Sequence, residues 1–586
     1  MTQPQLTSQR ELEVKQKQQT EQEIIKTLFS ERDNYQQSNR SQRDEFNEIY
    51  QSYIGSIFDV EDKSKSQEKI MKLRTEVNYI VPSIFSGKPE LECDVVGEED
   101  KDIAYVGEKI INHRLETIPQ AYEKIESWVK QAVVFGTSLI KVCWKTELED
   151  NEDETKRVGT DEPYLEVPNI LDCFYNPIIS DINCQPSLIF RSVLSVNEVK
   201  EKTAYDFKGD KGLNRDRVES KATTSDNVYD SSRQMTSDLI DSQKSAIGTV
   251  EVYERITEDR IQTVVDGKER LVLRDKPWQY GFINAVKLIH EPNAIPNRFE
   301  GYGVGQNTLG YSKLIQKLSN RLQDAVNMGN NPHFLGRKGA GIDKRQLLIC
   351  AGGLTEVDGD GPLQDQIQPL SVPDIKNGAL ELLNRFDDEH KRASGANDLM
   401  QGSASNKTLG QDQIASTYSS NRFELINRRF KQALADVGEM LLLMEIENIQ
   451  SIDAPILKIF PMEAEMTDGG KIQYSRETVY QMLLSAKEKK DLKFNVKVKG
   501  ETNVVRNKDI QIKQLVDMYN LFGATLPPQN QMAWARKMLE LRGVDEVDKL
   551  IPDMTEQEQI DPTTGQPIGA IDPTMMNKGM PQQPMV

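Results

Sequence analysis

Apolar residues recur at spacings of three and four in the early part of the chain. One such stripe runs through Ile70, Leu73, Val77 and Ile80. This spacing places the side chains on one face of an α-helix, so the sequence predicts a helical beginning. Residues 1–20 are rich in glutamine and glutamate with few apolar positions, and we expect them to form a disordered arm.

The spacing of apolar residues changes at Gly136. Before it the spacing is three or four residues, as in a helix, and after it the spacing is two, as in a strand. Glycine can adopt the left-handed conformation that ends a helix, and the residues from Leu139 to Trp144 alternate as in a strand. Further strand-like runs follow at 164–167, 187–194, 249–256, 261–265 and 271–274. The polar stretch 208–247 has too few apolar residues for a core and is expected to be a flexible loop. An α+β fold is therefore predicted.

The second half of the chain returns to helical spacing. One stripe contains Leu314, Leu318 and Leu322, and the next contains Leu382 and Phe386. The stripes indicate two helices separated by a stretch with many Gly, Pro and Asp residues. A glycine-bearing polar stretch follows the second helix, and then a third, longer helical stripe.

The last part of the chain is mixed. Short strands are expected at 457–460 and 492–499, followed by helices at 509–522 and 529–541. From Pro552 onward the sequence has no periodicity, and we expect a disordered tail.

Composition and charge narrow the class of protein. The chain has 586 residues and a formal net charge of −19, which argues against a protein that coats nucleic acid. No run approaches the roughly 20 apolar residues of a membrane span, and the first ten residues are polar, so no membrane partner is expected. Five scattered cysteines are typical of free thiols in a reducing cytoplasm.

Motifs for nucleotide or metal chemistry are poorly supported. The glycine–lysine pairs lack the upstream glycine and following hydroxyl of a phosphate-binding loop. Gly301, Gly303 and Gly305 lack the third glycine position of a dinucleotide fingerprint, and we interpret them as a flexible helix entry. The four histidines have no metal-ligand spacing. We therefore predict no cofactor, no metal site and no catalytic residue.

One carboxylate cluster would support an enzymatic function. Asp358, Asp360 and Asp365 could hold Mg²⁺ for phosphodiester cleavage. Pro362 stands where a further ligand would be needed, and the neighbouring glycines favour a solvated turn. A metal-dependent DNA-processing enzyme is thus one alternative, and a non-viral helical scaffold is another.

The order of the segments resembles the portal proteins of tailed bacteriophages, most closely the short-tailed phage type. Five stretches carry the resemblance, and each is weak alone but fairly specific in this order. They are the helix–Gly–strand step at 132–144, the stretch 167–177 with its following strand and capped helix, the glycine-rich 300–306 with its following helix and Asn-Pro, the stretch 394–410, and the late strand ending at Gly500.

The resemblance implies a division of the chain into portal subdomains. These would be a wing (21–300), a first stem helix (301–331), a clip (332–373), a second stem helix (374–393), a tunnel loop (394–410), a long helix (411–450), returning wing strands (451–508) and crown helices (509–551) before the tail (552–586).

Candidate site residues follow from the same resemblance. The stem would use the two leucine stripes given above, through Leu314, Leu318, Leu322, Leu382 and Phe386. The other candidates are Pro332, Arg337, Lys338, Asp358, Asp360 and Pro369 in the clip, and Ser394, Gly395, Asn397, Asp398, Gly402 and Lys407 in the tunnel loop.

The resemblance also implies a function and its partners. Portal subunits form a ring, usually of twelve, at one capsid vertex, through which double-stranded DNA is packaged and ejected. The implied partners are the terminase large subunit, the head-to-tail adaptor, and the major capsid and scaffolding proteins. The expected location is the virion, after assembly in the host bacterial cytoplasm.

Overall fold

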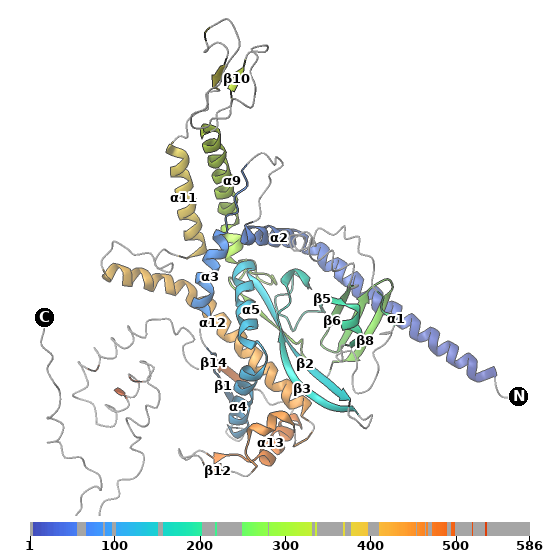
Figure 1. The fold of residues 1–586 in the computed structure, drawn as a ribbon. Helices are drawn as coiled ribbons and strands as arrows, with labels where there is room; N and C mark the ends of the chain where they lie inside the picture. Colours follow the sequence, from blue (N-terminus) through green and yellow to red (C-terminus); the bar gives the residue numbers. More distant parts are fainter. Residues whose placement is uncertain are drawn as a thin grey trace, which may run out of the picture. The chain divides into compact units, whose positions relative to one another are not determined.

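A computed structural model of the chain gives the fold (Figure 1). It describes residues 4–55, 66–85, 88–95, 101–150, 156–201, 217–219, 249–278, 280–330, 334–336, 362, 367–369, 377–396, 409–449, 451–452, 454–462, 465–466, 472–488, 494–498, 519, 534–535 and 539. The chain divides into two compact units, residues 1–502 and 503–586. In the second unit the rings of Tyr519 and Trp534 lie 6.4 Å apart. The expected crown and tail otherwise lie outside the described residues.

Helices and strands are both abundant in the first unit, which confirms the α+β class. The helices are α1 (Pro4–Ser38), α2 (Arg40–Ile54), α3 (Lys72–Ile84), α4 (Lys101–Thr117), α5 (Ala121–Phe135), α6 (Val196–Glu201), α9 (Val304–Asn330), α11 (Asn377–Ser394), α12 (Leu409–Asn448) and α13 (Arg476–Glu488), with 3-10 turns η2 (Ile170–Asp172) and η5 (Pro455–Ile459). None of the helices among the described residues is long and apolar enough to cross a membrane.

The strands pair antiparallel in separate small sheets. They are β1 (Leu91–Val95), β2 (Thr137–Asp150), β3 (Lys156–Glu166), β4 (Cys173–Phe174), β5 (Leu188–Ser195), β6 (Thr249–Ile256), β7 (Arg260–Asp266), β8 (Arg270–Pro277), β9 (Ala285–Ile289), β10 (Phe334–Gly336), β11 (Ile367–Pro369), β12 (Glu465–Met466), β13 (Ile472–Gln473) and β14 (Phe494–Val498). The larger sheets have the orders β3-β2-β9 and β4-β5-β6-β7-β8, and β1 pairs with β14.

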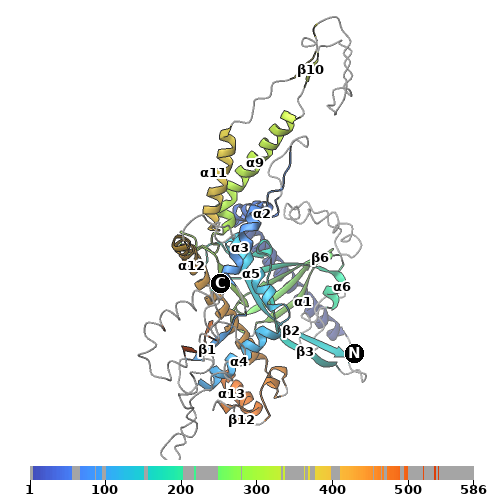
Figure 2. The ribbon, with the colours of Figure 1, turned by 60° about the vertical axis from the view of Figure 1, so that its left-hand side comes forward.

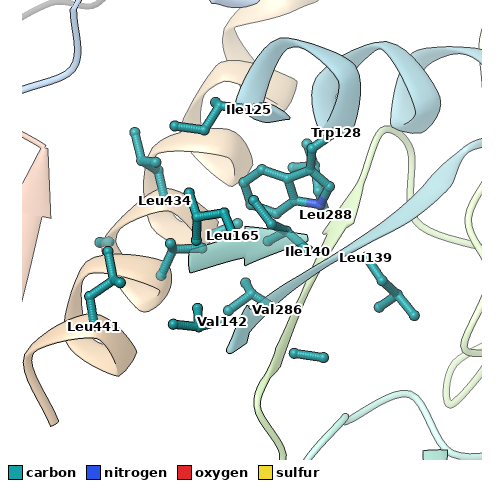
Figure 3. Close-up of a cluster of buried hydrophobic side chains, with 14 of the residues drawn as sticks. Ile125, Trp128, Leu139, Ile140, Val142, Leu165, Val286, Leu288, Leu434 and Leu441 are labelled. Atoms are coloured by element: carbon teal, nitrogen blue, oxygen red, sulfur yellow. The ribbon is translucent and has the colours of Figure 1, made fainter. Parts of the chain in front are cut away.

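The main core lies where helices α5 and α12 meet the β3-β2-β9 sheet. Figure 3 shows Trp128 of α5, Ile140 and Leu288 of the sheet, and Leu434 and Leu441 of α12 converging on one cluster. All five side chains are buried. The apolar positions that alternate along β2 and recur along α5 are therefore used on the faces that their periods predict.

The junction between α5 and β2 requires glycine. Gly136 has φ +85°, and its N–H caps α5 by donating to the carbonyl of Ala132 at 2.8 Å. A Cβ on Gly136 would lie 2.4 Å from the carbonyl oxygen of Gly301, and one on Gly303 would lie 2.4 Å from the Gly136 nitrogen. The expected flexible helix entry at 301–305 is instead a tightly packed backbone contact, so that interpretation is corrected.

The expected disordered arm over residues 1–20 is wrong, because α1 is helical from Pro4. Glutamine, glutamate and lysine are good helix formers, and the run continues into a part of α1 that packs on the five-stranded sheet. There Leu28 and Phe29 are buried in a cluster with Tyr253. Glu31 accepts two hydrogen bonds from the Arg255 guanidinium, at 2.7 and 2.8 Å.

Two late expectations also differ from the structure. The strand expected at 457–460 is the 3-10 turn η5, which begins at Pro455 and buries Ile456 and Leu457. Proline is favoured at the first position of such a turn and cannot donate to a sheet. The segment expected to hold returning strands also contains α13. The flexible loop expected at 208–247 lies outside the described residues except for 217–219, where Val218 is buried.

A buried lysine joins the two larger sheets. Lys141 of β2 lies 3.2 Å from Glu166 of β3 and 2.7 Å from Glu254 of β6, with its Nζ 4.6 Å from the centre of the Phe190 ring. Burial alone would lower the pKa of Lys141, but the two carboxylates hold it well above its ordinary value. The lysine therefore stays charged and ties the sheets together.

A second buried ion pair joins α4 to α12. The Arg114 guanidinium donates to the carboxylate of Glu445, and both side chains are almost completely buried. Burial raises the pKa of Glu445 to about 7 although Arg114 opposes the shift. Removal from water thus outweighs the attraction of the arginine.

We expect Glu445→Gln to remove a pH dependence from the free energy of unfolding. The folded pKa of about 7 lies above the ordinary value of 4.5, so the folded chain binds this proton more tightly. The stabilisation is complete below the ordinary pKa and is lost as the pH rises through the folded one, by up to about 3 kcal/mol. Chemical unfolding at about pH 5 and about pH 8 measures it. Equal losses in the wild type and the variant would contradict the prediction.

Candidate functional site

Helices α9 and α11 form a pair that leads from the core to a small two-stranded sheet. Figure 1 and Figure 2 both show the two helices side by side, with β10 beyond their far ends. The chain leaves the core along α9, and β10 pairs antiparallel with β11 before α11 returns. These elements include most of the candidate site residues that the structure describes.

The expected stem residues divide between buried and exposed positions. Leu318, Leu322 and Phe386 are half-buried, whereas Leu314 and Leu382 are exposed. Only part of the apolar stripe of α9 is therefore covered, and the rest is exposed. The remaining two, Leu314 and Leu382, are 44% and 41% exposed in the single subunit.

The clip and tunnel candidates lie mostly outside the described residues. Pro369 is described at the end of β11, opposite Phe334. Ser394 and Gly395 are at the end of α11. The candidates that lie outside are Pro332, Arg337, Lys338, Asp358, Asp360, Asn397, Asp398, Gly402 and Lys407.

The end of α11 is a helix cap. Gly395 has φ +82°, and its N–H donates to the carbonyl of Lys391 at 3.0 Å. Ser394 is buried, and its hydroxyl oxygen accepts from the N–H of Ala396 at 3.2 Å. These residues therefore fix where α11 ends, and any moving loop has to begin after Ala396.

A buried chain of three polar side chains joins α3, α9 and α11 at the base of the pair. Ser312 Oγ lies 2.9 Å from His390 Nε2, and His390 Nδ1 lies 2.8 Å from Glu76 Oε1. His390 is fully buried. The sequence indicated an ordinary packed or edge histidine here. The sequence signal for this contact is Glu76, a charged residue on the apolar helix face formed by Leu73, Val77 and Ile80.

The order Ser–His–Glu is also that of a hydrolase triad, but the surroundings do not suit that chemistry. Ser312 lies within α9, where the backbone N–H groups already bond to carbonyls one turn earlier. Acyl transfer needs free N–H groups near the nucleophile to hold the oxyanion. We interpret the three side chains, called the base pin below, as a structural contact.

Ionic contacts reinforce the base pin. Lys72, at the start of α3, pairs with Asp387 of α11, and Lys391 lies 3.8 Å from the same carboxylate. Burial lowers the pKa of Lys72, and the nearby Lys391 lowers it further. These contacts thus fix the position of α3 along α11, although the two helices are far apart in the sequence.

An extended segment, residues 66–71, runs along α9 and is called the strap below. The N–H of Ser66 donates to Asp324 at 2.7 Å, and the N–H of Glu68 donates to Asn320 at 3.2 Å. The Gln316 amide donates to the carbonyl of Glu68. Figure 1 shows this dark-blue segment on the side of α9 away from α11. The polar residues of α9 that bind the strap are spaced like the polar residues of a solvated helix face, so the sequence alone does not indicate that they are covered.

The geometry offers no metal site in the described parts of the chain. No group of three or more His, Cys, Asp or Glu side chains is arranged there to hold an ion. The rival cluster of Asp358, Asp360 and Asp365 lies outside the described residues. What the described site does offer is a helix pair with a fixed base and exposed apolar sides.

Comparison with known proteins identifies a family. A family model described as Phage SU10 portal protein matches residues 22–172 and 156–454. Together the matches run from residue 22 to residue 454 of 586, which includes α9, α11 and the whole base pin. A comparison with curated proteins finds no significant match.

We expect His390→Leu to destabilise the first unit more than removal of His390 and Glu76 together. The single change leaves the Glu76 carboxylate buried without its partner, which typically costs about 1–3 kcal/mol or more for a charged group. The double variant Glu76→Leu/His390→Leu removes both polar groups and should recover part of the loss. Thermal unfolding of the three chains measures the difference. A double variant less stable than the single one would show that Glu76 and His390 do not depend on each other.

Proposed function

Since the chain belongs to the portal protein family of tailed bacteriophages, we propose that it forms a ring of twelve subunits through which double-stranded DNA enters and leaves the capsid. The family match, which spans the α9–α11 pair, carries this proposal. Portal proteins are structural components of the virion, and their role is in DNA packaging. The number twelve is the family's usual one.

We assign the α9–α11 pair to the stem of the ring. The pair leaves the core, is fixed at its base by buried polar contacts, and carries leucines that a single subunit leaves exposed. Cyclic rings need two different surfaces on each subunit that fit each other around the ring. The two sides of a helix pair supply such surfaces.

The segment between the stem helices is proposed as the clip. It would bind the terminase large subunit during packaging and the head-to-tail adaptor afterwards. The wing and the crown would face the major capsid and scaffolding proteins. The antiparallel β10–β11 pair supports this assignment, because it brings the two ends of the segment together beyond the ends of α9 and α11.

The segment from residue 397 to the start of α12 is proposed as the tunnel loop that lies near DNA. The net charge of −19 supports a sliding role, because a field of the same sign as the phosphates lowers affinity for them. A conduit has to hold DNA weakly enough for it to move. The positive Lys407 would then act as a local contact in an acidic wall.

The proposed ring is tested by the native mass of the purified protein. Light scattering should give about 0.8 MDa, which is twelve times the 66.6 kDa of one chain. Electron micrographs of the same peak should show rings with a central hole. A stable monomer that cuts DNA in the presence of Mg²⁺ would overturn the proposal in favour of the enzyme.

Lys407→Glu is expected to reduce the yield of DNA-filled heads while leaving ring assembly intact. The substitution replaces a phosphate-attracting charge with a repelling one in the proposed loop. Lys407→Arg keeps the charge and is the matched control. The measurement is the ratio of filled to empty heads after infection with each variant. Equal ratios for both variants would remove Lys407 from the mechanism.

A further inference from the structure

The strap is bound to α9 by hydrogen bonds at several points along its length. Four polar residues of α9 bind it, at positions 316, 320, 324 and 327, and the Asn327 amide donates to Ser66 Oγ at 3.3 Å. Gln316 is 3% exposed and Asn320 is 9% exposed. Polar groups buried to this extent need their hydrogen bonds, so the strap is a fixed part of the stem surface.

The strap defines one side of the stem, called the strap side below. Met71, at the end of the strap, is 37% exposed. Leu380 of α11 is 50% exposed, and it lies seven residues before Asp387, the partner of Lys72 next to the strap. Seven residues are nearly two full turns, so Leu380 and Asp387 share one side of α11. The strap side therefore carries exposed apolar groups from two segments.

A second side of the stem, called the open side below, carries exposed leucines as well. Leu314 is 44% exposed and lies two residues before Gln316 and ten before Asp324, which places it about 160° and about 80° around α9 from these two strap-binding residues. Leu382 is 41% exposed and lies two residues after Leu380, so it points away from the strap side of α11. Both sides of one helix pair thus present leucine or methionine to solvent.

The exposed residues of the strap side and of the open side lie at similar positions along the axis of α9. Gln316 binds Glu68, three residues before Met71, and Leu314 lies less than one turn from Gln316. Leu314 and Met71 are therefore at similar heights on different sides of α9. Rotation about a ring axis does not change the height of an atom along that axis. In a ring whose stems run along the axis, Leu314 of one subunit comes level with Met71 of the next.

Charge agrees with this pairing. Arg321 lies seven residues after Leu314, on the open side, and is exposed. Glu68 of the strap is exposed, and its N–H bonds to Asn320, the residue beside Arg321 in sequence. Within the described residues neither charged side chain has an ion-pair partner. A second copy of the chain would bring these opposite charges together at one height.

We propose that the strap is the surface on which neighbouring subunits meet in the stem. The open side of one subunit, with Leu314 and Arg321, packs on the strap side of the next, against Met71 and Glu68. The inference rests on the proposed ring and adds which residues close it. A contact of this kind uses two different surfaces, so it propagates around a ring instead of ending at a dimer.

The first test is a disulfide between the two sides. In the full-length chain carrying Leu314→Cys and Met71→Cys, the two cysteines of one subunit lie on different sides of α9. A disulfide needs Cβ atoms about 4 Å apart, so oxidation should link neighbours only. Denaturing electrophoresis without reductant should show a ladder of covalent oligomers ending at the closed ring. Each single-cysteine variant and the parent chain with its natural cysteines are the controls.

The second test is a charge swap. Arg321→Glu should reduce the ring fraction in light scattering, and Arg321→Glu/Glu68→Arg should restore it. Arg428→Glu on α12 makes the same change in net charge at an exposed position outside the stem and should leave the rings intact. The restoration by the second substitution shows that loss of rings in the single variant is not a failure to fold.

The outcomes separate this inference from the function on which it rests. Rings in the wild type with no ladder and no effect of Arg321→Glu would overturn the strap contact and leave the portal function standing. A wild-type chain that never forms rings would overturn the proposed function and the strap contact together. A ladder combined with rescue by the double charge swap supports both.

Discussion

A contact between two stretches of backbone, at Gly136 and Gly303, sets where the α9–α11 helix pair, the proposed stem, begins. Any side chain at either position would collide with the other backbone, at distances of about 2.4 to 2.6 Å. The Gly301 N–H donates to the hydroxyl of Thr137 at 2.8 Å, and the Gln306 amide donates to the carbonyl of Phe135 at 3.0 Å. The start of α9 is thereby fixed to the end of α5 and the start of β2. The direction of α9, and with it the height of the base pin and the strap, depends on this contact.

Polar contacts along the stem specify its register more than its stability. Leucine stripes alone allow two helices to slide by a turn at little cost, because apolar packing is not directional. The contact of Ser312 with His390 aligns α11 with α9. The pairs of His390 with Glu76 and of Lys72 with Asp387 align α11 with α3. Buried ionic groups gain little net free energy, but a shifted alignment leaves them without partners. In the proposed ring the same alignment would be repeated in every subunit, so an error of one turn would misplace every contact between neighbours.

The sequence predicts the elements of the stem better than it predicts their surroundings. The helix–Gly–strand step and the two stem stripes could be read from apolar period alone, since period reports which face is buried. The polar stripe from Gln316 to Asn327 could not, because a buried polar face and a solvated one have the same letters. The strap that covers it comes from a segment some 250 residues earlier in the chain. His390 shows the same limit, because its partner Glu76 lies on another helix.

The N-terminal arm (residues 4–20) and the cap of α11 show a different limit of prediction from sequence. In both, the neighbouring helix decides the structure and the local composition does not. Residues 4–20 continue a helix that is fixed further along by Glu31 and Phe29. Propagation of a helix costs much less than its nucleation, so a polar run next to a docked segment becomes helical. At the other end of the stem, Ser394 and Gly395 have the composition of a loop but close the last turn of α11.

The position of α12 determines how the proposed tunnel loop can act on the rest of the subunit. The loop enters α12 at Leu409, and the second half of this helix is buried in the core through Phe430, Leu434 and Leu441. The other end of the loop follows the cap of α11, which the base pin fixes. A force on the loop therefore reaches two rigid helices, one in the stem and one in the core. Because interiors packed at crystal-like density transmit strain instead of absorbing it, a force on the proposed loop would reach the α9–α11 pair and the core together. The β1–β14 pair extends this connection past the stem, because it joins a strand that precedes α9 to one that follows α12.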